Sequence, residues 1–363
     1  MRAPLERWAS GGSCRRWGPS PSALASLAHP GDPTHRRHPL FVWGALFPIW
    51  IISAALMIRG SISPRPASAG SASGTSGAAF LKLAPGARPA GMGEAFAAVE
   101  GDAHAVFYNP AGLGRLRELQ ATGTHDARFQ GIRYEFAAVA VPLLSFTETE
   151  GDKSSRGALA VAVYNLAASG IERRGTTETD APTGTFGASD LAYSVAYGYA
   201  LSPAVSVGGA IKFVEQSLDD ARATAVAGDA GIALKRGASS FAGGIRNAGS
   251  APKFRDAGDP LPFTAYLAAA RPFGERWLAA ADLLLPRDQA AGLALGTEYA
   301  YPFDARLKGF LRAGFNTLHR DPGGISGLSL GGGLALGSMR FDFAWLPMGD
   351  LGNTFRYSVL ARF

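Results

Sequence analysis

The side chains best suited to chemistry in this chain are few and widely spaced. Three histidines follow residue 69, namely His104, His125 and His319, and the only cysteine is Cys14. No two of these histidines have metal-ligand spacing, and the usual zinc sites need several such ligands. His125 and the adjacent Asp126 could join a distant serine in a hydrolase site, but chance supplies such neighbours readily. We therefore predict no enzyme, no catalytic residue, no metal and no cofactor.

A pair of glycines around Met92 is the other pattern that could bind a ligand. Gly91-Met92-Gly93 has the spacing of loops that hold phosphate groups. Such loops follow a strand, and no strand pattern precedes this one. We therefore expect no phosphate role for it.

Net charge and targeting signals are concentrated in residues 1–69. This stretch has eight arginines and two acids, and the numbers of basic and acidic residues after it are equal, so it accounts for the net charge of +6. The charge gives no argument for a nucleic-acid partner. Arg36-Arg37, an apolar run from Leu40 to Ile58 and Ala67-Ser68-Ala69 predict a signal peptide that is removed; the alternative is a single membrane anchor. The sequence leaves open whether residues 1–35 are translated.

The elements that must position any site are β-strands. From about residue 119 onward, runs of roughly 8–13 residues alternate between apolar and small or polar positions, with turn residues between them. After residue 60 no apolar run of about 20 residues occurs, which excludes a bundle of membrane-spanning helices. We predict about 14 strands: 119–126, 132–142, 157–166, 189–201, 204–217, 224–235, 238–247, 262–271, 276–285, 290–301, 305–316, 326–337, 339–346 and 354–363.

The last of these strands indicates a membrane barrel. Phe355, Tyr357, Val359 and Phe363 share one face, and Arg356 lies on the other. An exposed apolar edge strand favours aggregation in a soluble protein, whereas a closed transmembrane barrel pairs its last strand with its first. The ending resembles the assembly signal of bacterial outer-membrane proteins, which we assign to Tyr357, Val359 and Phe363. We predict an all-β, antiparallel transmembrane barrel.

The lengths of the links between strands predict the orientation of the barrel. Short links fall at every second position, with 143–156 as the exception, so both chain ends are expected on the periplasmic side of the outer membrane. The long links 167–188, 248–261 and 317–325 would then be external. Charges of both signs are expected on the inward faces: Arg133, Glu135, Lys212, Asp229, Asp282, Glu298, Lys308, Arg312, Arg340, Asp342, Arg356 and Arg362.

The segment before the barrel does not alternate. Short helices are expected at 77–83, 92–99 and 103–108. The segment is too short to form its own core, so we predict a partly helical hatch inside the barrel lumen. The predicted division is a leader at 1–69, a hatch at 70–116 and a barrel at 117–363.

This segment closely resembles the start of the PorV/PorQ family, a branch of the FadL-like outer-membrane barrels. The resemblance rests on Phe80-Leu-Lys-Leu, on 86–96 and on 102–113, and more weakly on Asp259-Pro-Leu-Pro262. FadL-like proteins have 14-stranded barrels with an N-terminal hatch, as predicted above. The resemblance implies a hatch motif composed of Gly91, Met92, Gly93, Asn109, Pro110, Ala111 and Gly112. The Asn109 side chain is expected to hydrogen-bond neighbouring backbone, which would either fix the hatch or serve its gating.

Two functions are compatible with these features. The first is passage of small hydrophobic molecules across the outer membrane, through an apolar pocket lined by Phe80, Leu83, Met92, Phe96 and Phe107. The second is a PorV-like role as a component of a protein secretion or cell-surface attachment system, with external loops that bind partner proteins. Outer-membrane lipid is a partner in both. We slightly prefer transport.

Overall fold

The computed structural model describes residues 74–143, 157–177, 180–254, 257–319 and 325–363. The predicted leader and its cleavage site lie outside these ranges. None of the helices within them is long and apolar enough to cross a membrane.

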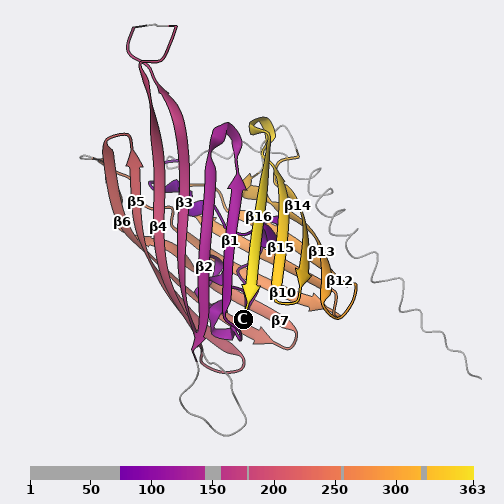
Figure 1. Cartoon of the computed structure of the whole chain (residues 1–363). Helices are drawn as coiled ribbons and strands as arrows, with labels where there is room; N and C mark the ends of the chain where they lie inside the picture. Colours follow the sequence, from indigo (N-terminus) through magenta and orange to yellow (C-terminus); the bar gives the residue numbers. More distant parts are fainter. Residues whose placement is uncertain (1–73, 144–156, 178–179, 255–256, 320–324) are drawn as a thin grey trace, which may run out of the picture. The chain divides into compact units, whose positions relative to one another are not determined.

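Fourteen antiparallel strands close into a barrel (Figure 1), which confirms the predicted fold class. Sequential neighbours pair all the way round, and β16 pairs with β1 to close the sheet. The strands are β1 (Gln120–Ala127), β2 (Arg133–Leu143), β3 (Gly157–Arg173), β4 (Gly184–Ala200), β5 (Val205–Leu218), β6 (Ala221–Arg236), β7 (Ser239–Gly249), β10 (Thr264–Phe273), β11 (Trp277–Pro286), β12 (Gly292–Pro302), β13 (Leu307–Asn316), β14 (Leu328–Leu336), β15 (Met339–Pro347) and β16 (Asn353–Arg362). A separate two-stranded ladder, β8 (Lys253–Phe254) with β9 (Ala257–Gly258), lies in the link after β7.

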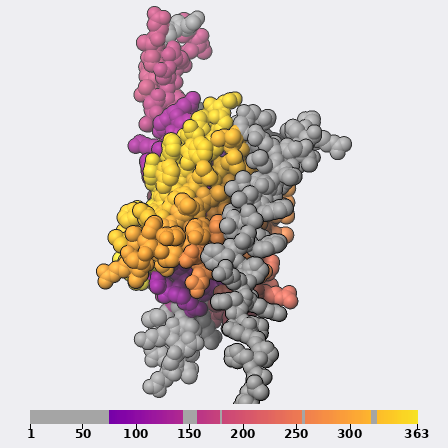
Figure 2. All heavy atoms as spheres, turned by 90° about the vertical axis from the view of Figure 1, so that its right-hand side faces the viewer, coloured from indigo at the N-terminus to yellow at the C-terminus, as the bar shows by residue number. Residues whose placement is uncertain are grey.

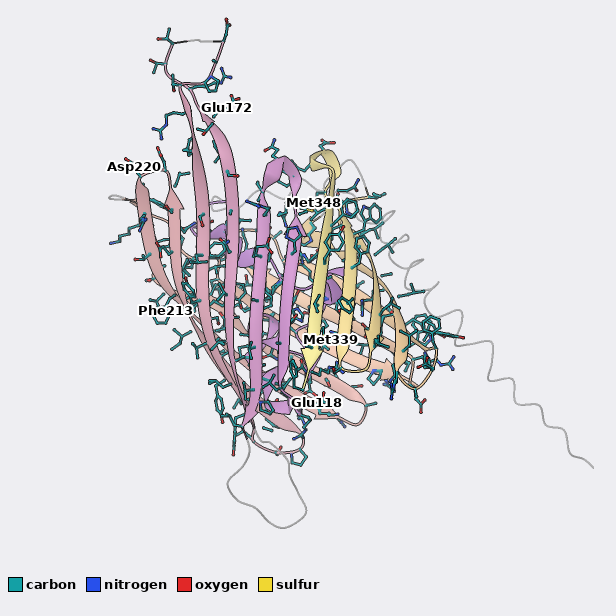
Figure 3. All side chains as sticks on the ribbon, in the orientation of Figure 1. Glu118, Glu172, Phe213, Asp220, Met339 and Met348 are labelled. Carbon is teal, nitrogen blue, oxygen red and sulfur yellow. The ribbon has the colours of Figure 1, made fainter. Side chains whose placement is uncertain are left out.

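Most strands lie within three residues of their predicted bounds, but β3 and β4 are much longer than expected. The predicted loop 167–188 is mostly a two-stranded ribbon, in which Ile171 pairs with Phe186 across a bulge that contains Gly170. We call residues 168–173 and 184–187 the β3–β4 ribbon. Figures 1 and 2 show it as a narrow projection, and Figure 3 shows Glu172 on it, beyond the level of Met348.

Burial along the strands follows the two-residue period of a sheet. On β4, Ala192, Ser194 and Ala196 are buried inside, whereas Tyr193 and Val195 are about half exposed on the outer face. Small inward residues leave room for a segment inside the barrel, and large apolar outward residues form the surface that a membrane barrel presents to lipid.

Two of the expected inward charges lie on the outer face. Arg133 is exposed and Glu135 is partly exposed, while their neighbours Tyr134 and Phe136 are buried inside. Tyr134 donates a hydrogen bond to the Leu83 carbonyl inside the barrel (2.9 Å). Burial of two aromatic side chains outweighs the preference of charges for a lumen at this position, close to the end of the strand.

The links divide the barrel into two ends. At the short-link end, where β16 finishes, five hairpin links have two to four residues, as between β14 and β15 or β4 and β5. The long-link end has the β3–β4 ribbon and the 14-residue link from β7 to β10, although its β5–β6 link has only two residues. The predicted exception, the link from β2 to β3, lies outside the described residues. Aromatic pairs lie near the short-link end, with Trp277 against Tyr299 (4.6 Å between ring centroids) and Tyr301 against Phe303 (5.0 Å).

Residues 74–117, here called the inner segment, pack against the inner faces of the strands. Its elements are η1 (Ala79–Lys82), α2 (Ala87–Gly91), α3 (Ala105–Tyr108) and η2 (Pro110–Arg115). Gly74 donates to the Asp288 carbonyl at the long-link end, and Arg115 reaches the Pro203 carbonyl at the short-link end. The segment therefore traverses the barrel. The chain end at Phe363 lies at the short-link end, and the side reached by residues before Gly74 stays a prediction.

The helix expected at 92–99 is absent, and α2 lies before it. Gly93 and Glu94 both have left-handed backbone, with φ of 64° and 65°. Two consecutive residues in that conformation end a right-handed helix. The apolar period of 92–99 therefore reflects burial of an irregular stretch.

Candidate functional site

The Asn109-Pro110-Ala111-Gly112 motif is a capped turn buried at the short-link half of the barrel. The Asn109 side-chain oxygen accepts the Ala111 N–H (3.1 Å), and its amide donates to the Ala97 carbonyl (3.1 Å). The same amide lies 3.4 Å from the Ile232 carbonyl of β6. Pro110 begins η2, where no N–H is needed. Asn109 therefore joins two parts of the inner segment to the barrel wall.

Barrel glycines receive this turn. A Cβ atom at Gly198 of β4 or Gly208 of β5 would overlap the Pro110 backbone, and one at Gly231 of β6 would overlap the Asn109 side chain. Backbone therefore packs directly on backbone, which only glycine allows at these positions.

A second set of glycines on another part of the wall receives Gly91-Met92-Gly93. A Cβ at Gly296 of β12 would overlap Met92, and one at Gly314 of β13 would overlap Gly93. The Gly93 N–H donates to the Ser329 hydroxyl of β14 (3.0 Å). Both predicted hatch motifs are thus contact points with the barrel wall.

Replacing Gly208 with valine should displace the inner segment, because the added atoms would occupy the position of Pro110. Overpacking typically costs about 1–3 kcal/mol. We expect faster tryptic cleavage after Lys82 and Arg115 in the folded barrel, and a lower urea midpoint. Gly123→Val on β1 is the control, since a Cβ there meets no atom within 4 Å. Equal proteolysis of the two variants would contradict the close packing.

Six charges, of which five are buried and Arg88 is partly buried, join the inner segment to the barrel in a closed ring. Going round, the nitrogen–oxygen distances are Arg88–Glu298 2.7 Å, Glu298–Arg312 2.6 Å, Arg312–Asp342 2.9 Å, Asp342–Arg340 2.9 Å, Arg340–Asp102 3.2 Å and Asp102–Arg88 2.9 Å. Positive and negative charges alternate and balance. Two members belong to the inner segment and four to β12, β13 and β15. We call this set the six-charge ring; it contains four of the twelve charges that the sequence predicted on the inward faces.

Asp102, the acid of the ring on the inner segment, has a further partner in His104. His104 Nδ1 lies 2.7 Å from an Asp102 oxygen, and its ring stacks on Phe136. This histidine therefore belongs to a structural contact between segment and wall.

A second group of charges lies nearer the long-link end. Arg356 bonds Asp126 (2.7 Å) and the Ala84 carbonyl (2.5 Å), and it lies 3.6 Å from Glu94. Glu94 is also 3.6 Å from His319. Asp126 faces inward while His125 pairs with Glu135 on the outer face (2.7 Å), so the His125–Asp126 pair considered above is not formed. Within the described ranges, no three His, Cys, Asp or Glu residues gather as metal ligands would.

Near the long-link end, Asp288 attaches the start of the inner segment. Its carboxylate accepts hydrogen bonds from Ser76 (2.5 Å) and Lys82 (2.7 Å). Burial alone would raise the pKa of Asp288, but the hydrogen bonds from Lys82 and Ser76 lower it below the ordinary carboxyl value.

Acid should therefore loosen this attachment. Because the folded-state pKa is lowered, the contribution is complete above the unfolded value of about 3.9 and is lost as pH falls through the lowered one. Hydrogen-exchange protection of the Gly77 and Leu81 N–H groups should therefore drop as the pH falls below about 4. Asp288→Asn should show weaker protection at pH 5 and little further change. An equal loss of protection on acidification in the wild-type chain and in Asp288→Asn would contradict the role of Asp288 in this attachment.

The five side chains predicted to line a ligand pocket lie in the packed interior. Met92 and Phe96 are fully buried, Phe80 and Phe107 are 3% exposed, and Leu83 is partly buried. The structure brings Phe96 and Phe107 together against Tyr108, with ring centroids 5.3 and 5.0 Å away. In this state the side chains serve as contacts between the inner segment and the barrel.

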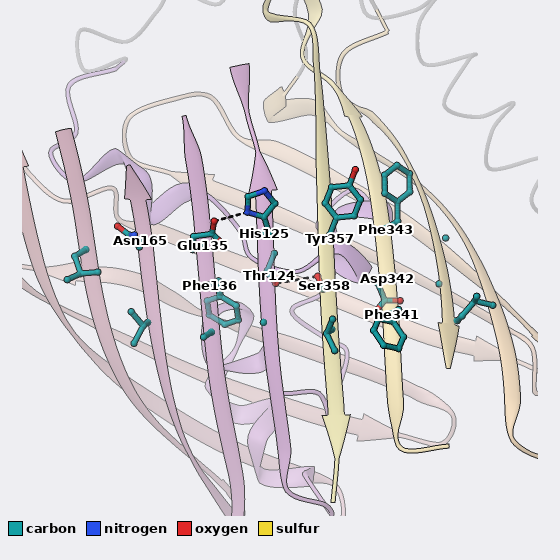
Figure 4. A pocket seen from close by; sticks show the side chains of 18 residues that line it. Thr124, His125, Glu135, Phe136, Asn165, Phe341, Asp342, Phe343, Tyr357 and Ser358 are labelled. Carbon is teal, nitrogen blue, oxygen red and sulfur yellow. Dashed lines mark hydrogen bonds and ion pairs between the residues drawn. The ribbon is translucent and has the colours of Figure 1, made fainter. Parts of the chain in front are cut away.

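A groove of about 920 Å³, here called the outer groove, lies on the outer face of the barrel wall (Figure 4). Gly123 and Ala137 are among the residues that line it, and so are His125 and Glu135, which pair with each other. Its walls include Tyr357 and Val359, which are about half and two-fifths exposed. None of the five predicted pocket residues lines it. Phe363, the third residue of the predicted assembly signal, is 77% exposed, and its N–H donates to the Leu119 carbonyl.

The six-charge ring and the glycine contacts were not predicted from the sequence. The glycines have a recognisable signal, because Gly198, Gly208, Gly231, Gly296 and Gly314 fall on the inward faces of the strands. The pairing within the ring has no local signal, since its members come from four separate parts of the chain.

Several solved structures have a similar fold. No protein-family model and no curated protein matches the sequence. Among solved structures, the Ralstonia pickettii toluene transporter TbuX matches with a TM-score of 0.51 and 13% identity, covering 77% of this chain and 98% of that chain. The likeness is one of fold. A Pseudomonas aeruginosa FadL homologue matches with a TM-score of 0.51, 11% identity and coverage of 76% and 97%. The Pseudomonas putida toluene transporter TodX matches with a TM-score of 0.50 and 13% identity, covering 77% of this chain and 96% of that chain.

Proposed function

We propose that this protein passes small hydrophobic molecules across a bacterial outer membrane, with the inner segment as its hatch. The observation that carries the proposal is the attachment of this segment inside a closed barrel through the six-charge ring and glycine contacts. A water-filled pore needs no such segment, whereas a conduit for apolar solutes benefits from an interior that excludes water. The fold likeness to two toluene transporters supports the same class of solute.

In the proposed orientation, the short-link end faces the periplasm and the β3–β4 ribbon projects from the cell. Barrels of the outer membrane have short periplasmic turns and longer external loops. The aromatic pairs Trp277–Tyr299 and Tyr301–Phe303 would then form part of the periplasmic interface girdle. Tyr357, Val359 and Phe363 would act as the assembly signal at that side.

A second role, binding of partner proteins, is favoured by the β3–β4 ribbon. Its strands extend past their pairing with β2 and β5, so among the described residues 169–173 and 184–186 each have a free edge that an extended peptide could join. This role would suit the PorV/PorQ resemblance of the inner segment and a place in a secretion system. Co-purification from intact membranes tests it, and recovery of the barrel alone would count against it.

The transport proposal is tested by uptake of radiolabelled toluene into cells with and without the gene. Faster uptake is expected when the protein is present. A barrel with its external ribbon shortened between residues 169 and 187 serves as a control, since transport through the interior should survive that change. Identical uptake with and without the protein would overturn the proposal.

A further inference from the structure

Six exposed bases gather on three neighbouring hairpins at the short-link end of the barrel. These hairpins join β6 to β7, β10 to β11 and β12 to β13, and they are adjacent because β7 pairs with β10 and β11 pairs with β12 (Figure 1). Each hairpin has two of the bases, whereas the short links β4–β5 and β14–β15 contain no charged residue. We call the six residues the basic sector: Lys235, Arg236, Arg271, Arg276, Arg306 and Lys308.

The acids nearby do not neutralise the basic sector. Glu275 and Asp304 lie on the same hairpins, so six bases face two acids. The Asp304 carboxylate accepts the backbone N–H groups of Arg306 (2.6 Å) and Leu307 (2.8 Å), which engages it within its own turn. Within the described ranges, none of the six basic side chains forms an ion pair. Exposed arginines near the long-link end do have acidic partners, in the pairs Arg173–Asp219, Arg174–Glu172 and Arg222–Glu215.

Two of the six bases lie on the outer face of the barrel, in line with apolar side chains. Arg236 continues the outward row of β6 after Leu234, which is about two-fifths exposed. Arg271 lies between Leu267 and Phe273 on the outward row of β10, and its guanidinium carbon is 5.4 Å from the Phe273 ring centroid. These arginines therefore lie where the apolar outer surface meets the polar end of the barrel.

Aromatic rings mark the same level of the barrel. Trp277 follows Arg276 directly and packs against Tyr299, and the Tyr301–Phe303 pair lies on the next hairpin. Tryptophan and tyrosine gather at the depth of lipid headgroups, and long basic side chains extend toward that depth from an apolar surface. This placement favours a lipid over a soluble protein as the partner of the basic sector.

We propose that the basic sector binds the phosphate groups of anionic phospholipids in the leaflet at the short-link end. Bases close to a membrane surface attract anionic lipids by about fivefold each, and a guanidinium also matches phosphate oxygens in geometry. In the proposed orientation this leaflet is the periplasmic one. The inference goes beyond the transport function, since it concerns the outer surface and not the solute inside.

The test uses Trp277 as a reporter in full chains reconstituted into phosphatidylcholine vesicles. In one chain Trp277 is the only tryptophan, with the other five replaced by phenylalanine; in a second chain the only tryptophan is Trp345, near the long-link end. Brominated phosphatidylglycerol should half-quench Trp277 at a mole fraction about fivefold or more below that of brominated phosphatidylcholine. Trp345 should show little difference between the two lipids.

Variants of the Trp277 chain separate charge from packing. Arg236→Gln combined with Arg271→Gln should remove most of the preference, whereas Arg236→Lys with Arg271→Lys should keep most of it. Arg173→Gln with Arg174→Gln, which changes two exposed arginines on the β3–β4 ribbon, is the matched control and should change nothing. In the unaltered sector, salt at about 1 M should weaken the preference because it screens exposed charges.

Each other result contradicts the proposal. Equal quenching of Trp277 by the two lipids, a preference that salt leaves unchanged, or one that survives both Arg→Gln changes would overturn it. An equal preference at Trp345 would show that the whole chain attracts anionic lipid, and would overturn the assignment to the basic sector. Retention of the unaltered chain on immobilised poly-L-glutamate, without any lipid preference, would identify the sector as a surface for acidic proteins instead.

Discussion

Replacing Arg88 with methionine should release the inner segment from the barrel wall while the barrel itself stays folded. Arg88 is the basic member of the six-charge ring on the inner segment, bonded to Glu298 and Asp102. Without it, Glu298 keeps Arg312, and Asp102 keeps Arg340 and His104. Breaking a buried pair typically costs about 3–5 kcal/mol, and here that cost falls on the attachment of the segment.

Two measurements check this expectation. Hydrogen exchange should become faster at residues 87–93, and reconstituted vesicles should become leaky to small hydrophilic dyes. Arg222→Met is the matched control, because its ion pair with Glu215 is exposed and 3.8 Å long, and such pairs contribute little. Vesicles that stay impermeable to the dyes, together with unchanged hydrogen exchange at residues 87–93, would show that the ring does not hold the segment.

A disulfide between the inner segment and β16 should have the opposite effect and abolish passage. The Ala87 N–H donates to the Ser358 hydroxyl at 2.5 Å. Standard bond lengths then limit the Cα separation to about 6.4 Å, which a disulfide can span. In a chain with Cys14→Ser, the pair Ala87→Cys and Ser358→Cys should lose nearly all toluene uptake under oxidising conditions and regain it with a reductant.

The single-cysteine chains provide the controls for this experiment. Each should transport at its own constant rate whether or not the reductant is present. If the crosslinked chain transports as well as the reduced one, the solute passes without movement of the segment near Ala87, and the hatch proposal fails.

The barrel could be predicted from the sequence because each strand is recognised from residues that are adjacent in the chain. A two-residue alternation and turn residues locate each strand, and link lengths give the pairing order. The ribbon of β3 and β4 escaped prediction because Gly170 and the polar residues around it have the composition of a loop. Their strand geometry depends on pairing with the opposite strand, as Ile171 with Phe186 shows.

The interior was harder to predict because its contacts join distant parts of the chain. Alternation showed that Glu298, Arg312 and Asp342 would face inward, but not that Arg88 and Asp102 would complete a ring with them. Arg133 and Glu135 were expected to face inward because they are charged. They lie on the outer face because Tyr134 and Phe136 have apolar partners inside the barrel.

The position of the inner segment next to the closing strand constrains the order of assembly. η2 ends at Arg115 and β1 begins at Gln120, and β1 is also the strand that seals the barrel against β16. Threading Arg88 and Asp102 through a finished, densely filled cylinder would strip both of water before they met their partners. We therefore expect the sheet to wrap around the segment, with the β1–β16 seam formed last, so that the inner segment and the barrel wall reach their final structure in a single step.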